Sequence, residues 1–220
     1  GLLIIAPEPL LPALSDFARF KKTQRPVEVC GLASLLAESE SFDDPERVKR
    51  AIYKRYQSTQ LGFVLLVGDA DVFPVRYMVL DRATAPAFHY AFYPSDLYYA
   101  DVAKADGGFE DWNAAREGFH AGYFGEVRGE KNKDGPINFD RIDYRPELAV
   151  GRWPVATPEQ LATVIAKTIA TEKRLETGKE TPRAACVAVS GWVDSRANMD
   201  HMAKAFAAPW TVEKRYDGAA

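Results

Sequence analysis

Short apolar runs alternate with amphipathic stretches in the N-terminal part of the chain. The runs at residues 2–6, 27–30 and 63–67 have the length of strands, and the first and the third are apolar on both faces. The stretches between them, at 10–21 and 44–56, place apolar residues three and four positions apart, which is the spacing of an amphipathic helix. Strands that are apolar on both faces and separated by helices indicate a parallel sheet with helices on both sides.

The same alternation returns after residue 146. Strands are predicted at 148–151, 184–190 and 211–216, and helices at 157–175 and 198–208. Two helix starts are marked by a polar cap followed by proline and an acid, at Asp44-Pro45-Glu46 and at Thr157-Pro158-Glu159. We therefore predict an α/β fold with a mainly parallel sheet between two layers of helices.

The middle of the chain follows neither period. Apart from a short strand predicted at 75–80, residues 73–146 are rich in aromatic residues, Asp and Gly and have no sustained pattern. Residues 101–146 are predicted to form a long irregular excursion, and loops of this length are usually functional, metal-bound or disordered. This pattern predicts a first α/β subdomain over about 1–155 and the start of a second over about 156–220.

Composition excludes several classes of protein. The 220 residues are 47% hydrophobic and 27% charged, with a net charge of −3 that is mixed along the chain. This mixture contains no basic cluster that would bind nucleic acid. No apolar run has the roughly 18 residues of a membrane span. The chain opens inside a strand without an initiator Met and ends just after another strand, so we expect it to be a piece of a longer protein.

Phosphate chemistry is not expected at the first strand end. A dinucleotide site needs closely spaced glycines there, whereas this turn reads Ala6-Pro7-Glu8-Pro9. Glu8, Asp69 and Asp71 resemble the acidic cluster of a phospho-receiver, but the lysine of such a site has no counterpart. Neither a nucleotide nor a phosphorylated aspartate is therefore predicted.

A self-contained catalytic dyad is also not expected. Cys30 and Cys186 both lie inside apolar strands, where cysteine is usually a buried and inert core residue. His89 and His120 lie among aromatic residues in irregular segments, and His201 lies on a predicted helix. Since none of the three histidines directly follows a strand, none is placed to activate a thiol.

Carboxylates gather in and just before the long excursion. Hard oxygen ligands on loops suit calcium rather than zinc, although the pattern alone favours solvated loop acids over a metal site. No haem site is expected. The candidate metal ligands are Asp69, Asp96, Asp101, Asp111 and Glu126, within a wider set of oxygen donors that includes Asp71, Asp106 and Asn113.

An ordered set of motifs resembles the gingipain-type cysteine peptidases. It includes Phe63-Val64-Leu65-Leu66-Val67-Gly68-Asp69-Ala70, then Ser95-Asp96-Leu97-Tyr98-Tyr99-Ala100-Asp101, then Glu147-Leu148-Ala149-Val150-Gly151-Arg152 with Pro154-Val155. The resemblance covers essentially the whole chain. It implies a caspase-like fold, an extracellular or cell-surface bacterial setting, bound calcium and a cysteine endopeptidase mechanism acting on polypeptides.

The same resemblance implies that the catalytic residues lie elsewhere. In the family the catalytic His stands in a Gly-His-Gly stretch and the Cys follows a later strand, whereas no His here is followed by Gly. We therefore expect no catalytic residue in this chain, and we expect the remainder of the catalytic domain as its partner. The family's acidic residue for basic substrates falls nearest to Asn198, with Asp194 and Asp200 alongside as pocket candidates, so a preference for Arg or Lys does not carry over.

Three functional hypotheses follow. The first is a part of a cysteine endopeptidase that supplies scaffold and part of the substrate cleft. The second is a non-catalytic homologue that acts as a binding or assembly module. The third is an unrelated α/β domain that binds a small ligand near Asp69 and Asp71.

Overall fold

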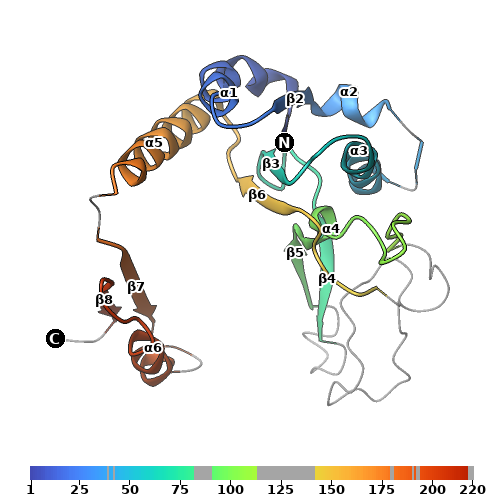
Figure 1. The fold of residues 1–220 in the computed structure, drawn as a ribbon. Coiled ribbons are helices and arrows are strands. Elements are labelled where there is room, and N and C mark those ends of the chain that lie inside the picture. The colour runs from blue at the N-terminus through green and yellow to red at the C-terminus, as the bar shows by residue number, and fades with distance from the viewer. Residues whose placement is uncertain are drawn as a thin grey trace. The chain divides into compact units, whose positions relative to one another are not determined.

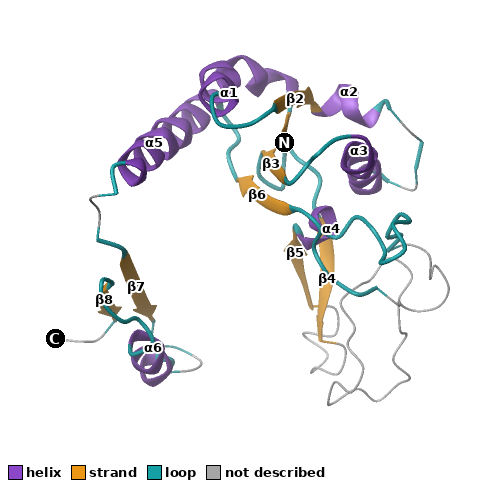
Figure 2. Cartoon of the chain, viewed as in Figure 1, coloured by secondary structure: helices purple, strands orange, loops and turns teal. Residues whose placement is uncertain are grey.

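The computed structural model describes residues 1–38, 40–41, 43–81, 91–112, 142–178, 181–189, 191 and 194–217 (Figure 1). The chain divides into two compact units, Gly1–Ala166 and Lys167–Ala220, and each is considered by itself. Helices and strands alternate along the sequence in both units (Figure 2). The predicted subdomain boundary near residue 155 stays a prediction.

Unit 1 is organised around a four-stranded parallel sheet. Its strands are β1 (Leu2–Ala6), β2 (Val27–Gly31), β3 (Phe63–Val67) and β6 (Ala149–Trp153), in the order β2-β1-β3-β6. All three pairings are parallel, with Leu2 opposite both Val27 and Phe63, and Phe63 opposite Ala149. The prediction of an α/β fold with a mainly parallel sheet is confirmed.

The segments between these strands are mostly helical. β1 is followed by the 3₁₀ helix η1 (Glu8–Leu14) and by α1 (Ser15–Lys22). β2 is followed by α2 (Leu32–Leu36) and α3 (Asp44–Ser58). After β3 come an antiparallel hairpin of β4 (Arg76–Asp81) and β5 (Ala91–Ser95) and then α4 (Leu97–Ala100). The helix predicted over 10–21 is thus divided in two. Pro12 lies inside η1, and a proline removes the amide that a continuous α-helix would use at that point.

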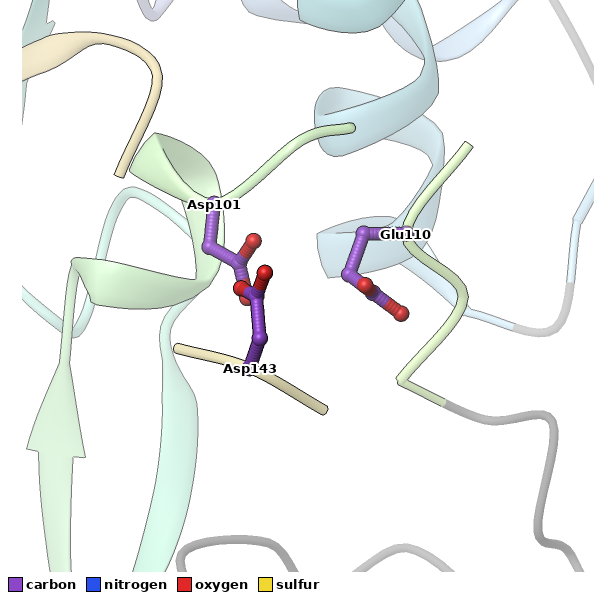
Figure 3. Close-up of side chains that lie close together, drawn as sticks. All are labelled: Asp101, Glu110 and Asp143. Atoms are coloured by element: carbon purple, nitrogen blue, oxygen red, sulfur yellow. The ribbon is translucent and has the colours of Figure 1, made fainter. Parts of the chain in front are cut away.

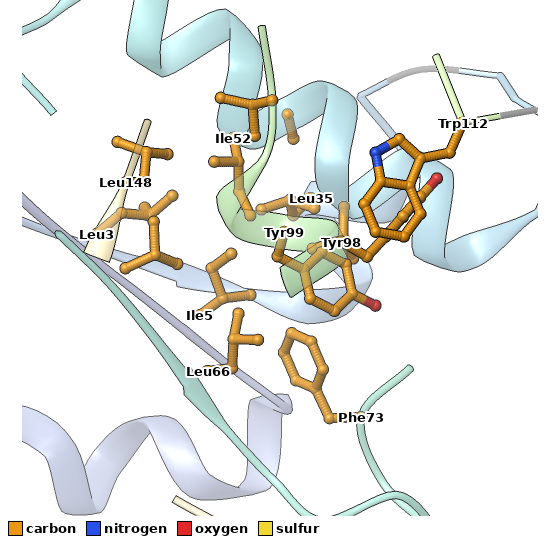
Figure 4. Packing of buried hydrophobic residues seen from close by; sticks show 14 of the residues in the cluster. Leu3, Ile5, Leu35, Ile52, Leu66, Phe73, Tyr98, Tyr99, Trp112 and Leu148 are labelled. Atoms are coloured by element: carbon orange, nitrogen blue, oxygen red, sulfur yellow. The ribbon is translucent and has the colours of Figure 1, made fainter. Parts of the chain in front are cut away.

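The main core lies on one face of the sheet. Leu3, Ile5, Val64 and Leu66 point into a cluster with α3 and α4, and all four are at most 2% exposed (Figure 4). Aromatic rings extend this cluster away from the sheet, with ring centroids 5.4 Å apart for Tyr98 and Tyr99 and 5.0 Å apart for Tyr98 and Trp112. Alternate strand residues such as Leu2 point to the opposite face, which η1 and α1 partly cover.

Helix ends explain where α3 and α5 (Pro158–Glu176) begin. The Asp43 carboxylate accepts a hydrogen bond from the Glu46 amide at 3.0 Å, so the cap of α3 lies one residue before the predicted Asp44. At α5, Thr157 Oγ1 accepts from the Gln160 amide while Gln160 Oε1 accepts from the Ala156 and Thr157 amides. Such reciprocal capping satisfies amides that have no partner within the helix.

Unit 2 contains the C-terminal part of α5 and a small α/β arrangement. Strands β7 (Arg183–Ala188) and β8 (Thr211–Tyr216) pair in parallel and are joined by α6 (Arg196–Ala203). Both strands were predicted, but the helix expected over 198–208 ends at Ala203. Among the helices within the described ranges, none combines the length and apolar content that crossing a bilayer requires.

Candidate functional site

Arg152 joins three segments at the carboxyl end of the central strands. Its guanidinium binds both carboxylate oxygens of Asp96, with Nε–Oδ2 at 2.9 Å and Nη2–Oδ1 at 2.7 Å. It also donates to the carbonyls of Gly68, at 2.9 Å, and Pro74, at 3.2 Å. Only 13% of the Arg152 side chain is exposed. Through these hydrogen bonds Arg152 connects β6 with the loop after β3 and with the turn before α4. This is the edge of a parallel sheet at which ligands usually bind.

Gly68 allows the loop after β3 to turn back on itself. Its φ angle is +136°, and a Cβ at this position would lie 2.8 Å from Cβ of Phe73. The Phe73 ring packs edge-on against Tyr99 and lies 5.0 Å from the Arg152 guanidinium carbon. Since an L side chain here meets both unfavourable φ and a steric clash, glycine is required for this loop.

Glu8 ties the end of β1 to the start of α2. Its Oε1 accepts hydrogen bonds from the amides of Ala33 at 2.9 Å and Ser34 at 3.3 Å. A Cβ on Gly31 would lie only 2.5 Å from this oxygen, so the absence of a side chain at residue 31 makes the contact possible. Glu8 therefore acts as a link between two elements rather than as a member of an acidic ligand site.

Asp101, Glu110 and Asp143 bring carboxylates together beside α4 (Figure 3). One oxygen from each lies within 4.8 Å of the others, although Asp143 comes from a distant part of the sequence. Asp101 is fully buried: its Oδ2 accepts from Trp112 Nε1 at 2.8 Å, and its Oδ1 has no hydrogen-bond partner. Three carboxylate oxygens at this spacing fit part of the coordination shell of a hard cation such as calcium.

The buried side chain of Lys49 lies close to the same cluster. Its Nζ lacks a hydrogen-bond partner and faces the rings of Tyr98, Phe109 and Trp112 at 4.6, 5.5 and 4.9 Å. Burial lowers the pKa of the Lys49 ammonium, while the neighbouring carboxylates of Asp101 and Glu110 oppose that change. Burial also raises the pKa of Asp101, which the Trp112 hydrogen bond and Lys49 partly offset.

Of the four predicted metal ligands that the structure describes, one belongs to this cluster. Asp101 is part of it, whereas Asp96 is paired with Arg152 and Asp69 accepts a hydrogen bond from the Asp71 amide. Asp111 acts on Lys49 by its charge and is not a member of the group. Glu126 lies outside the described residues.

The predicted pocket residues lie around α6 in unit 2. Asp194 accepts hydrogen bonds from both Nε and Nη2 of Arg196, at 2.9 and 2.7 Å, and these bonds lower its pKa to about 2. Asp200 accepts from Lys214 Nζ at 2.6 Å and from the Tyr216 hydroxyl at 3.0 Å. Asn198 is exposed in the first turn of α6. Both acids are therefore already paired within unit 2.

Neither cysteine is arranged as a nucleophile. Burial and the nearby Glu28 carboxylate raise the pKa of the Cys30 thiol to about 11, and the thiol donates to Glu28 Oε1 at 3.0 Å. Cys186 is 5% exposed inside β7, and both cysteines are free thiols. His201 lies in α6, while His89 and His120 lie outside the described residues. Cys186 is buried as expected, whereas Cys30 is only half-buried, and the inertness of both thiols stays a prediction.

Comparison with known families decides the relationship. The profile of peptidase family C25 matches residues 1–219, which is nearly the entire chain. The chain belongs to peptidase family C25. No curated protein matches the sequence.

Solved structures show the fold that this family C25 chain adopts. The crystal structure of the Arg-specific cysteine proteinase gingipain R (RgpB) is similar with a TM-score of 0.58 and 16% identity, over 100% of this chain and 41% of that one. A complex of the pro- and mature domains of Porphyromonas gingivalis RgpB gives a TM-score of 0.55 and 16% identity, over 100% and 42%. The fold is thus the caspase-like α/β fold of gingipains, and the chain spans about two fifths of those chains.

Several residues of this candidate site were not identified from the sequence. Glu110 and Asp143 were not identified because they lie far apart within the long excursion and match no metal motif. Lys49 lies on an amphipathic helix with many other charges, so its burial has no local signal. Arg152 was part of a family motif, and its position directly after the strand predicted at 148–151 was the one available indication of its role; in the structure it lies inside β6.

Proposed function

We propose that this chain supplies the scaffold and part of the substrate cleft of a gingipain-type cysteine endopeptidase. The observation that carries the proposal is the family C25 match over residues 1–219. The catalytic His and Cys are proposed to come from residues outside these 220. In support, Cys30 and Cys186 lie inside strands, and the Cys30 thiol is held protonated at neutral pH.

The proposal predicts that activity requires more than this chain. A longer form of the protein should hydrolyse fluorogenic peptides and lose activity on treatment with iodoacetamide, while the 220-residue chain should show no turnover. Cys30→Ala and Cys186→Ala in the longer form should keep the activity, because neither thiol is proposed as the nucleophile. Turnover by the 220-residue chain that an alkylating agent blocks would refute the proposal. A folded longer form that binds polypeptides without cleaving them would instead support a non-catalytic homologue.

The remainder of the catalytic domain is proposed as the partner of unit 2. In this unit Val187 and Val189 are 57% and 66% exposed, and β7 pairs only with β8 among the described strands. A parallel sheet is stable when both faces are covered, and two strands alone are marginal. These exposed apolar residues are consistent with further chain packing against β7. An extracellular or cell-surface location is proposed from the family resemblance alone.

The first turn of α6 is proposed to border the pocket for the substrate side chain. Asp194 and Asp200 are each paired with a cation of unit 2, so Asn198 is the pocket candidate that remains available to a substrate. In the longer form, Asn198→Asp is expected to raise kcat/KM for substrates with Arg or Lys at the cleavage site, relative to apolar ones. The matched change Asn198→Ser should not, because serine adds no charge. Equal effects of both substitutions on both substrates would contradict this role.

Asp101, Glu110 and Asp143 are proposed as ligands of a calcium ion. Support comes from the spacing of their oxygens and from the buried Asp101 Oδ1, which no protein donor satisfies. Calcium bound there would hold α4 and the two loops together by charge. We expect the melting temperature of the chain to fall on addition of a chelator, and Asp101→Asn to remove that dependence. The control Asp106→Asn changes an exposed acid outside the group and should keep it. No change of melting temperature on chelation would exclude this site.

A further inference from the structure

We propose that unit 1 carries a second binding site, for a small aromatic carboxylate, on the face of the sheet opposite the main core. A cavity of about 340 Å³ lies there against β1, β3 and β6, with α1 on one side. This volume falls at the lower end of the range for small-molecule sites. The inference is independent of the peptidase function proposed above.

The floor of the cavity is apolar and flat. Leu2, Phe63 and Ala149 lie side by side in the register of the sheet, and Phe63 is 45% exposed. One step further along the strands, Leu65 pairs with Gly151. A Cβ on Gly151 would have no atom within 4 Å, so the floor is open above this residue.

Two aromatic side chains line the cavity beside this floor. Phe17 of α1 and Trp153 of β6 contact one another with ring centroids 4.7 Å apart. Aromatic rings gain from offset or edge-to-face contact with other rings, in addition to the apolar area they bury. Together with Phe63, these side chains favour a ligand with a flat aromatic body.

Arg25 supplies the charge that a ligand would meet. Its guanidinium carbon lies 4.3 Å from the ring centroid of Phe63, and within the described segments its side chain makes no hydrogen bond or ion pair. Lys21 of α1 also lines the cavity and adds a second positive charge. The Nε atom is buried and lacks an acceptor. None of the residues that line the cavity is acidic. A carboxylate suits this position, because it can bind an arginine side chain through two parallel hydrogen bonds.

The test compares two probes of one shape, 2-naphthoate and the neutral 2-naphthamide, by titration of the ¹⁵N-labelled 220-residue chain. Naphthoate should shift the Gly151 amide and the Arg25 Nε signal and bind about tenfold more tightly than naphthamide, since a hydrogen bond to a charged group is the stronger kind. Gly151→Val should weaken both probes at least about tenfold by filling the cavity. Arg25→Gln should remove the preference for naphthoate, and Lys22→Gln, on α1 but outside the cavity, should leave it unchanged.

The same spectra report whether each variant is folded. If Gly151→Val is unfolded, Ala149→Leu fills the same cavity from the neighbouring exposed position and replaces it. Equal affinity of the two probes for the unaltered chain would overturn the proposal. So would unchanged naphthoate binding in the folded cavity-filling variant, or the absence of any shift at millimolar naphthoate.

Discussion

Replacing Arg152 should loosen the central sheet of unit 1. Arg152→Ala removes two hydrogen bonds to Asp96 and one each to the carbonyls of Gly68 and Pro74. Breaking a buried ion pair costs roughly 3–5 kcal/mol, and the cost is lower here because the Asp96 side chain is 28% exposed and regains water. Each carbonyl that loses its donor adds about 1 kcal/mol. A loss of about 3 kcal/mol is therefore expected.

Hydrogen exchange is the suitable assay, because a chain with two compact units has no single free energy of unfolding. The slowest amides of β1, β3 and β6 should exchange about 100-fold faster in Arg152→Ala, which corresponds to about 3 kcal/mol. Amides of β7 and β8 in unit 2 serve as an internal control and should not change. Arg152→Lys keeps the charge but lacks the planar fork, so we expect it to lose about half as much.

A double-mutant cycle isolates the pair itself. Asp96→Asn keeps the shape of the side chain and removes its charge, and the cycle with Arg152→Lys should show a coupling energy above about 1 kcal/mol. If Arg152→Ala speeds the exchange of these amides by less than about threefold, Arg152 does not hold this edge together. If Arg152→Lys behaves like the unaltered chain, charge alone is sufficient and the fork geometry is irrelevant.

Further predictions concern Gly68, Cys30 and Asp43. Gly68→Ala should destabilise unit 1 by about 2 kcal/mol in the same exchange experiment, because its φ is positive and its Cβ meets Phe73. The control Gly62→Ala, where a Cβ meets nothing within 4 Å, should change exchange little. At pH 8 iodoacetamide should alkylate Cys30 about 200-fold more slowly than an exposed thiol, because a raised pKa leaves less thiolate. The rate should rise tenfold per pH unit up to about pH 11, and a fast reaction at pH 8 would contradict the raised pKa. Asp43→Ala should destabilise unit 1 by about 3 kcal/mol, because Asp43 both caps α3 and binds Arg76 through two hydrogen bonds, at 2.7 and 2.8 Å. A destabilisation below about 1 kcal/mol would show that these contacts are unimportant.

The strands of this chain were predictable because their signal is local. A strand of a covered parallel sheet is apolar on both faces, and β1 and β3 stand where the apolar runs place them. The start of α5 was likewise visible in Thr157-Pro158-Glu159. The hairpin strand β5 and the short helices α2 and α4 were missed. The two helices have five and four residues, too few for a helical period to be recognised, and β5 contains Pro94, which weakens its strand signal.

The candidate site was less predictable because its contacts are long-range. Asp96 was read as a metal ligand, but its partner is Arg152, 56 residues away in the sequence. Cys30 was read as an apolar core residue, whereas its thiol lies between Glu28 and Arg55, from β2 and α3. Acidic residues give the same local signal whether they bind a metal, an arginine or water. Only the packing of the elements distinguishes these cases.

The charges around Asp101 bear on the calcium proposal. With all groups ionised, Asp101, Glu110 and Asp143 contribute −3 and the buried Lys49 contributes +1, which leaves −2 across two buried carboxylates and one exposed carboxylate. Lys49 alone therefore cannot neutralise the cluster, and its Nζ directs its charge toward aromatic rings rather than toward a carboxylate oxygen. Asp101 and Glu110 are buried whereas Asp143 is exposed, and buried carboxylates are costly unless protons or a cation compensate their charge. The raised pKa values of Asp101 and Glu110 favour protonation of these carboxyl groups. A divalent cation would compensate their charge without protonation. Lys49 is thus compatible with calcium binding. Its positive charge changes the net charge of the three carboxylates from −3 to −2, which one calcium ion balances.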